Sequence, residues 1–182
     1  AMARKAGRKI MELAAKNIRP SQILTPAAFR NAIVIHSAIG GSTNALLHLP
    51  AIAAELGMEL DPAIFNEINS YIPHIGNINP SGQHLTESFW FAGGIPKVQL
   101  LLEKYLDLDV MTVTGKTLGE NLEAIKKDHF FERGEGYLHN YHLVPEDVIT
   151  PAETTEEVGS IAVLKGNLAP EGAVVKYSAC EK

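Results

Sequence analysis

The sequence predicts an α/β fold, with a helix-rich part of a three-layer α/β domain over residues 1–148, followed by a linker and the first strands of a β-rich domain over residues 149–182. Three observations support this prediction. Capping residues precede several apolar segments, residues 110–113 alternate like a single short strand, and the turn around residues 166–170 separates two further alternating runs.

Helix starts are the clearest signals in the first third of the chain. Residues 1–15 are rich in helix formers but lack a capping start. Thr25-Pro26 combines an N-cap hydroxyl with proline at the first helical position, and predicts a helix that ends near Ile39. A second long helix is expected over residues 43–56. Pro50 is expected to kink or break this helix, because proline lacks an N–H donor.

Weaker signals place the remaining elements. Asp61-Pro62 predicts a short helix, whereas Gly134 and Gly136 argue against a helix over residues 129–145, which are expected to form an irregular connection. The other expectations, in chain order, are a loop over residues 73–82, helices over residues 86–91, 96–105 and 117–127, an acidic linker over residues 151–157, and strands over residues 161–164 and 173–177.

The most informative segment is the glycine pair Gly40-Gly41 followed by Ser42-Thr43-Asn44, between two apolar segments. Glycines permit positive φ, and Ser42 or Thr43 can cap the next helix. Free amides and small hydroxyls at such a turn suit a carboxylate or phosphate. The alternative is that these residues only cap a buried helix.

Two other motifs are weaker. Thr114-Gly115-Lys116-Thr117 resembles the end of a phosphate-binding loop, but Val110 stands where that motif requires its first glycine, so nucleotide binding is not expected. Whether Lys116 touches a substrate stays open. His139 and His142 have a spacing that could hold a metal on a helix, yet no cysteine or carboxylate cluster completes a site, so both are expected at the surface or in packing.

Five blocks along the chain resemble the dihydroxy-acid and sugar-acid dehydratase family. The first covers residues 31–49, including the Gly40-Gly41 turn. The others are Asn79-Pro80-Ser81-Gly82 and the segments 92–96, 112–121 and 163–176, all in family order. The resemblance implies a hydro-lyase that removes water from a 2,3-dihydroxy acid to give a 2-keto acid, and a β-barrel-like domain that begins near the end of this chain.

The substrate implied first by the resemblance is a sugar acid, an aldonate such as D-xylonate, because residues 74–79 and 83–90 look most like a bacterial branch acting on aldonic acids. The polar loop over residues 77–84 could hydrogen-bond a polyol tail. The alternatives are a dihydroxy-acid dehydratase of branched-chain amino-acid synthesis, which would require a more apolar lining, and a noncatalytic binding module.

The candidate residues facing substrate or cofactor are Gly41, Ser42 and Thr43, followed by Ser81, Gly82 and His84 from the loop. His36 and His48 lie in apolar helices and are expected to be structural, each neutral and donating to a backbone carbonyl.

The resemblance further implies an iron–sulfur cluster and Mg²⁺ in the full-length enzyme, held by residues that precede the matched part, and a serine base beyond its end. Cys180 is the sole cysteine, whereas such clusters require several thiolates. The chain is therefore expected to be an internal fragment that is inactive in isolation, binds none of these cofactors, and supplies no catalytic residue.

Composition excludes some classes of partner. A net charge of −5 provides no basic surface for nucleic acid, and the apolar runs are shorter than the roughly 20 residues that span a bilayer. A single cysteine and no signal peptide favour a cytoplasmic protein. The unpaired edges of the strands near the end of the chain favour a homo-oligomer.

Overall fold

A computed structural model describes residues 2–180, with the backbone alone for Met2. The elements are α1 (Met2–Ala15), α2 (Pro20–Ile23), α3 (Pro26–Ala38), α4 (Ala45–Glu55), α5 (Ala63–Asn69), α6 (Thr86–Phe91), α7 (Gly94–Leu101), η1 (Glu103–Tyr105), α8 (Leu118–Lys127), α9 (Phe130–Leu138), η2 (His139–Tyr141), α10 (Pro145–Val148), β1 (Ala162–Gly166), β2 (Ala169–Val175) and η3 (Tyr177–Ala179). The helix-rich α/β prediction is confirmed, with a two-stranded antiparallel sheet near the end of the chain.

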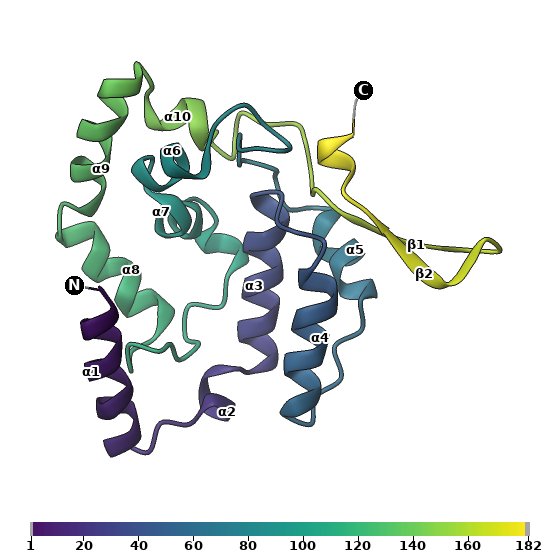
Figure 1. The fold of residues 1–182 in the computed structure, drawn as a ribbon, viewed down its shortest axis with the longest axis horizontal. Coiled ribbons are helices and arrows are strands. Elements are labelled where there is room, and N and C mark those ends of the chain that lie inside the picture. Colours follow the sequence, from purple (N-terminus) through teal and green to yellow (C-terminus); the bar gives the residue numbers. More distant parts are fainter. Residues whose placement is uncertain (1, 181–182) are drawn as a thin grey trace.

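Helix α3 is the centre of the fold, with α4 and α5 on one side and α6 to α9 on the other (Figure 1). Thr25 caps this helix as expected, because its hydroxyl accepts from the Ala28 N–H at 3.2 Å. Ile33 and Val34 are fully buried and belong to a continuous core with Phe65 of α5 and Val98 of α7. Apolar side chains on more than one face of α3 therefore hold the helices on both sides of it.

The predicted strand over residues 110–113 is wrong. The structure has only an isolated bridge between Met111 and Thr117 there. Polar side chains close a tight turn instead: Asn121 donates from Nδ2 to Thr112 Oγ1 at 2.8 Å and to the Thr117 carbonyl at 2.9 Å. Thr117 then caps α8 reciprocally with Glu120. This motif is thus a structural helix start, and the Lys116 side chain is exposed.

The irregular connection predicted over residues 129–145 is also wrong, because α9 occupies most of it. Helical glycine costs about 1 kcal/mol relative to alanine, but a Cβ on Gly134 would lie 2.3 Å from the Phe91 carbonyl oxygen. Glycine thus allows α9 to approach α6 closely, and the Tyr137 ring stacks on that of Phe91 at 5.1 Å. Tertiary packing outweighs local propensity here.

Pro50 neither ends nor breaks α4, which runs through it. Proline removes one backbone hydrogen bond. The helix is held on either side of that position by Leu46 and Ala53, whose side chains are buried. The expected break is therefore absent.

The chain after residue 158 is attached to α5 by asparagine side chains. Asn69 is buried, accepts from the Ser160 and Ile161 N–H groups at 2.6 and 3.1 Å, and donates to the Phe65 carbonyl. Asn66 makes a two-bond contact with the backbone of Val163. The side-chain amides of Asn69 and Asn66 thus satisfy backbone groups of the segment that leads into β1 and of β1 itself, as a neighbouring strand would. They fix the position at which the hairpin begins.

The two predicted strands near the end of the chain are confirmed as the β1–β2 hairpin, which projects from the helices (Figure 1). Ala162 pairs with Val175, and the register shifts between Leu164 and Gly166. Beyond β2 the chain turns back toward the end of α3 (Figure 1). Within the described residues, no helix has the length and apolar character needed to cross a membrane.

Candidate functional site

The turn over residues 40–44 begins where α3 ends. Gly40 has φ of +63°, a left-handed conformation that glycine adopts without steric cost, and the Gly41 N–H donates to the His36 carbonyl at 2.9 Å. This bond terminates the helix. The Gly41 amide, which the sequence suggested as an anion donor, is therefore already engaged.

Neither Ser42 nor Thr43 caps α4 as the capping interpretation expected. The N-cap is Asn44, which makes no side-chain capping bond. Ser42 Oγ instead accepts from the Asn44 N–H at 3.2 Å and stabilises the turn. Within residues 2–180, the Thr43 hydroxyl and the N–H groups of Ser42 and Thr43 have no hydrogen-bond partner, and both residues are exposed. These three donors remain free to bind a ligand.

His36 lies beneath the turn and is structural, as expected. Its Nε2 lies 2.8 Å from the Ser42 carbonyl oxygen, so Nε2 donates, while its buried Nδ1 makes no hydrogen bond to the described residues. The ring contacts Phe65 edge to face at 5.7 Å. Burial lowers the pKa of His36, the bond to Ser42 opposes this, and the charge of Lys176 lowers the pKa further. The imidazole is therefore neutral at pH 7 and fixes the turn.

His48 differs from the expectation of a buried structural histidine, because it is exposed on α4. The neighbouring Leu47 is also exposed, at 71%. This side of α4 is not covered by other described residues. His48 is therefore exposed although its neighbours in the sequence are apolar.

Three segments distant in the sequence meet at Gly40. A Cβ built on Gly40 would lie 3.0 Å from both His74 Nε2 and Ser81 Oγ, and 3.6 Å from Ser178 Oγ. Ser81 Oγ and Ser178 Oγ are 2.9 Å apart and share a hydrogen bond. The Lys176 ammonium donates to the Gly40 carbonyl. The turn, the loop and the segment after β2 thus form one polar junction around a residue that has no side chain.

The loop over residues 77–84 contributes mainly through Ser81. Asn77 accepts from the Gln83 N–H at 3.0 Å and donates to the Asp147 carbonyl at 2.8 Å, so its amide is engaged within the protein. A Cβ on Gly82 would lie 2.3 Å from the Asn77 carbonyl carbon, so Gly82 is required for the shape of the loop. The backbone of His84 pairs with Asn77 and Asn79. The structure therefore brings Ser81 to the turn and assigns Gly82 a role in loop closure.

Two adjoining cavities flank this junction and share Ser81 and Glu157. The smaller, of about 160 Å³, is lined by polar groups that include His74 and Asn77. The larger, of about 420 Å³, is lined in part by Tyr177, Ser178 and Cys180. His74 Nδ1 in the smaller cavity lies 3.6 Å from Oε2 of Glu157, which lines both cavities. A small polar ligand would fit beside the turn.

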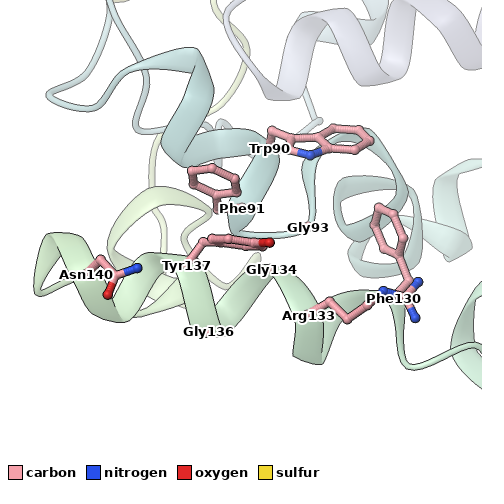
Figure 2. Close-up of a pocket in the computed structure, with 9 residues that line it drawn as sticks. All are labelled: Trp90, Phe91, Gly93, Phe130, Arg133, Gly134, Gly136, Tyr137 and Asn140. Atoms are coloured by element: carbon pink, nitrogen blue, oxygen red, sulfur yellow. The ribbon is translucent and has the colours of Figure 1, made fainter. Parts of the chain in front are cut away.

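An aromatic hollow of about 530 Å³ lies elsewhere, between α6 and α9. Figure 2 shows the stacked rings of Phe91 and Tyr137, with Trp90 and Phe130 on the other side of the hollow and Arg133 at its rim. None of its lining residues belongs to the Gly40 junction. We therefore treat it as separate from the candidate site.

Lys176 and Ser178 were not identified from the sequence. Lys176 is half-buried, and burial, with no acidic neighbour opposing it, lowers its pKa. No carboxylate within residues 2–180 forms an ion pair with it. The local signal is a lysine that directly follows the apolar end of β2, residues 173–175, and lysines are common at such positions.

The described part of the chain does not contain the ligands that a metal ion or an iron–sulfur cluster would need. Cys180 is exposed, and no group of three His, Cys, Asp or Glu side chains is placed to hold an ion within residues 2–180. His139 and His142 accordingly form no metal site with other described residues. Any cluster or Mg²⁺ of the complete enzyme would need ligands from outside these residues.

Comparison with known proteins agrees with the motifs. The family model "Dihydroxy-acid/6-phosphogluconate dehydratase N-terminal" matches residues 1–121. Similar proteins include dihydroxy-acid dehydratases from Acetivibrio thermocellus (48% identical over 180 residues), Caldicellulosiruptor bescii (45% over 181) and Methanothermobacter thermautotrophicus (39% over 180). Each match covers 98% of this chain and 30% of the relative. The chain thus spans about 30% of the length of these curated relatives.

Proposed function

The chain belongs to the dihydroxy-acid/6-phosphogluconate dehydratase family, and from this premise we propose that the protein is a hydro-lyase that dehydrates an aliphatic 2,3-dihydroxy acid to a 2-keto acid. The observation that supports this substrate is the sequence identity of 39–48% to relatives named dihydroxy-acid dehydratase, over nearly the whole chain. The sugar-acid substrate expected first receives no such support, because none of these relatives carries a sugar-acid or xylonate name.

The loop geometry also favours the aliphatic acid. The sugar-acid prediction relied on amide groups that could hydrogen-bond a polyol tail. Both polar atoms of the Asn77 amide are engaged with backbone groups of this chain. A polyol would have to compete with these internal bonds, whereas an aliphatic tail requires no such donors.

The reaction removes the proton on C2 and the hydroxide on C3, which together leave as water, and the resulting enol tautomerises to the 2-keto acid. This chain supplies binding groups for it. The free amides of Ser42 and Thr43 and the Thr43 hydroxyl can donate to a carboxylate, and the Ser81–Ser178 hydroxyl pair can bond a substrate hydroxyl. These groups orient the acid, while proton removal requires a base from elsewhere in the complete enzyme.

The test is a direct comparison of substrates. The full-length protein is assayed with 2,3-dihydroxyisovalerate and with D-xylonate at matched concentrations, and formation of the 2-keto acid is followed. A higher kcat/KM for dihydroxyisovalerate supports the proposal. A clear preference for xylonate would restore the sugar-acid substrate, and no turnover of either acid would contradict the proposed reaction.

A further inference from the structure

Lys176 carries a charge that the described part of the protein does not neutralise. Its ammonium has three N–H donors, and the hydrogen bond it makes within residues 2–180 is the one to the Gly40 carbonyl. The two cavities beside the junction are lined by one carboxylate, Glu157, whose Oε2 lies 3.6 Å from His74 Nδ1. A half-buried cation with unused donors and no counter-ion costs folding free energy, and such groups are concentrated at binding sites.

The surroundings of Lys176 are suited to an anion. Gly40, whose carbonyl it contacts, immediately precedes the turn that holds the free amides of Ser42 and Thr43. The ammonium is also near enough to His36 to lower the pKa of that ring by charge repulsion. The His36 ring in turn bonds the Ser42 carbonyl. The positive charge therefore lies at the turn itself, although Lys176 and Gly40 are 136 positions apart in the sequence.

We propose that Lys176 binds the carboxylate of the dihydroxy acid against the turn over residues 40–43. This inference rests on the proposed function for the identity of the acid, although a carboxylate is common to aliphatic and sugar acids. The ammonium and the turn amides offer charge-assisted hydrogen bonds to one carboxylate, and the bond to the Gly40 carbonyl holds the ammonium in place. Lys176 is thus a substrate-binding residue contributed by the segment after β2.

The experiment uses the full-length enzyme with the variants Lys176→Gln, Lys176→Arg and, as a matched control, Lys165→Gln. Glutamine keeps a donor without the charge, and arginine keeps the charge. Lys165 is an exposed lysine in β1, whereas Lys176 directly follows β2. For Lys176→Gln we expect a 10- to 100-fold rise in the KM for dihydroxyisovalerate, with a smaller change in kcat. We expect a rise of less than about fivefold for Lys176→Arg and none for Lys165→Gln, because a charge-assisted bond is lost only in the first variant.

Calorimetry with the product, 3-methyl-2-oxobutanoate, measures carboxylate binding without turnover. Its Kd should rise in Lys176→Gln by a factor similar to that of the KM. A lowered Tm with unchanged KM and Kd would overturn the proposal and show that Lys176 only supports the Gly40 carbonyl. If the wild-type enzyme prefers xylonate, the proposed substrate fails, yet the KM for xylonate must still rise in Lys176→Gln for this inference to stand.

A second measurement needs no variant and covers the case in which Lys176→Gln does not fold. Reductive methylation of the wild-type enzyme is followed by mass spectrometry with and without saturating 3-methyl-2-oxobutanoate. Bound carboxylate should slow the labelling of Lys176 at least threefold and leave Lys165 unchanged. Equal labelling of Lys176 in both conditions would overturn the proposal.

Discussion

The contact between Gly41 and His36 allows a quantitative test of the turn. A Cβ on Gly41 would lie 2.1 Å from Cδ2 and 2.6 Å from Nε2 of His36. Gly41→Ala must therefore displace the imidazole and break its 2.8 Å bond to the Ser42 carbonyl. Overpacking costs about 1–3 kcal/mol and the bond about 0.5–1.5 kcal/mol, so we expect the free energy of unfolding to fall by about 2–4 kcal/mol.

A double-mutant cycle tests whether the clash with the His36 ring causes the loss of stability in Gly41→Ala. His36→Ala removes the obstacle and should itself cost about 1–3 kcal/mol, through the lost bond and the lost contact with Phe65. In that background Gly41→Ala should cost less than about 1 kcal/mol, because φ of Gly41 is not in the left-handed region. Urea unfolding of the four proteins gives the coupling energy. Equal costs of Gly41→Ala in both backgrounds would refute the reasoning.

Two further predictions concern stability. Asn69→Ala should lower the free energy of unfolding by about 2–5 kcal/mol, because it leaves the buried N–H groups of Ser160 and Ile161 without an acceptor; a loss below about 1 kcal/mol in urea unfolding would contradict this. Burial holds the pKa of His36 in the folded protein below 6.5. Between that lowered pKa and 6.5, the unfolded chain therefore binds more protons than the folded protein. The free energy of unfolding rises with pH through this window and falls as the pH is lowered through it. The Tm of the wild-type protein should therefore drop on acidification below about pH 6.5, more steeply than that of His36→Ala, and parallel Tm profiles would argue against this account.

The sequence predicts those elements whose causes are local. Thr25-Pro26 and Thr117 are helix starts because a cap acts on amides within its own first turn, and both appear where expected. Residues 110–113 fail as a strand because a strand also needs a partner, and the hydrogen bonds of Asn121 fold the segment into a turn instead. Local patterns do not reveal whether such a partner exists.

The sequence does not predict helix α9 or the contribution of Lys176 and Ser178 to the Gly40 junction, because both depend on contacts between distant segments. Gly134 opposes a helix by propensity, and only its contact with the Phe91 backbone explains why glycine is needed there. The Gly40-Gly41 turn could be identified from its residues, and Ser81 was a candidate from its loop. Ser178 and Lys176 could not be identified, because they reach Gly40 only after Asn69 has fixed the course of the chain before β1.

Thr43→Val tests most directly whether the turn over residues 40–44 faces the substrate. The Thr43 side chain is exposed and makes no hydrogen bond within residues 2–180, so valine keeps its shape and removes no described contact. In the full-length enzyme we expect an unchanged Tm. We also expect the kcat/KM for dihydroxyisovalerate to fall about 10- to 100-fold, through loss of a bond to a charged group worth roughly 1.5–3 kcal/mol. Unchanged kinetics, with or without a lower Tm, would show that the turn does not bind the substrate through Thr43.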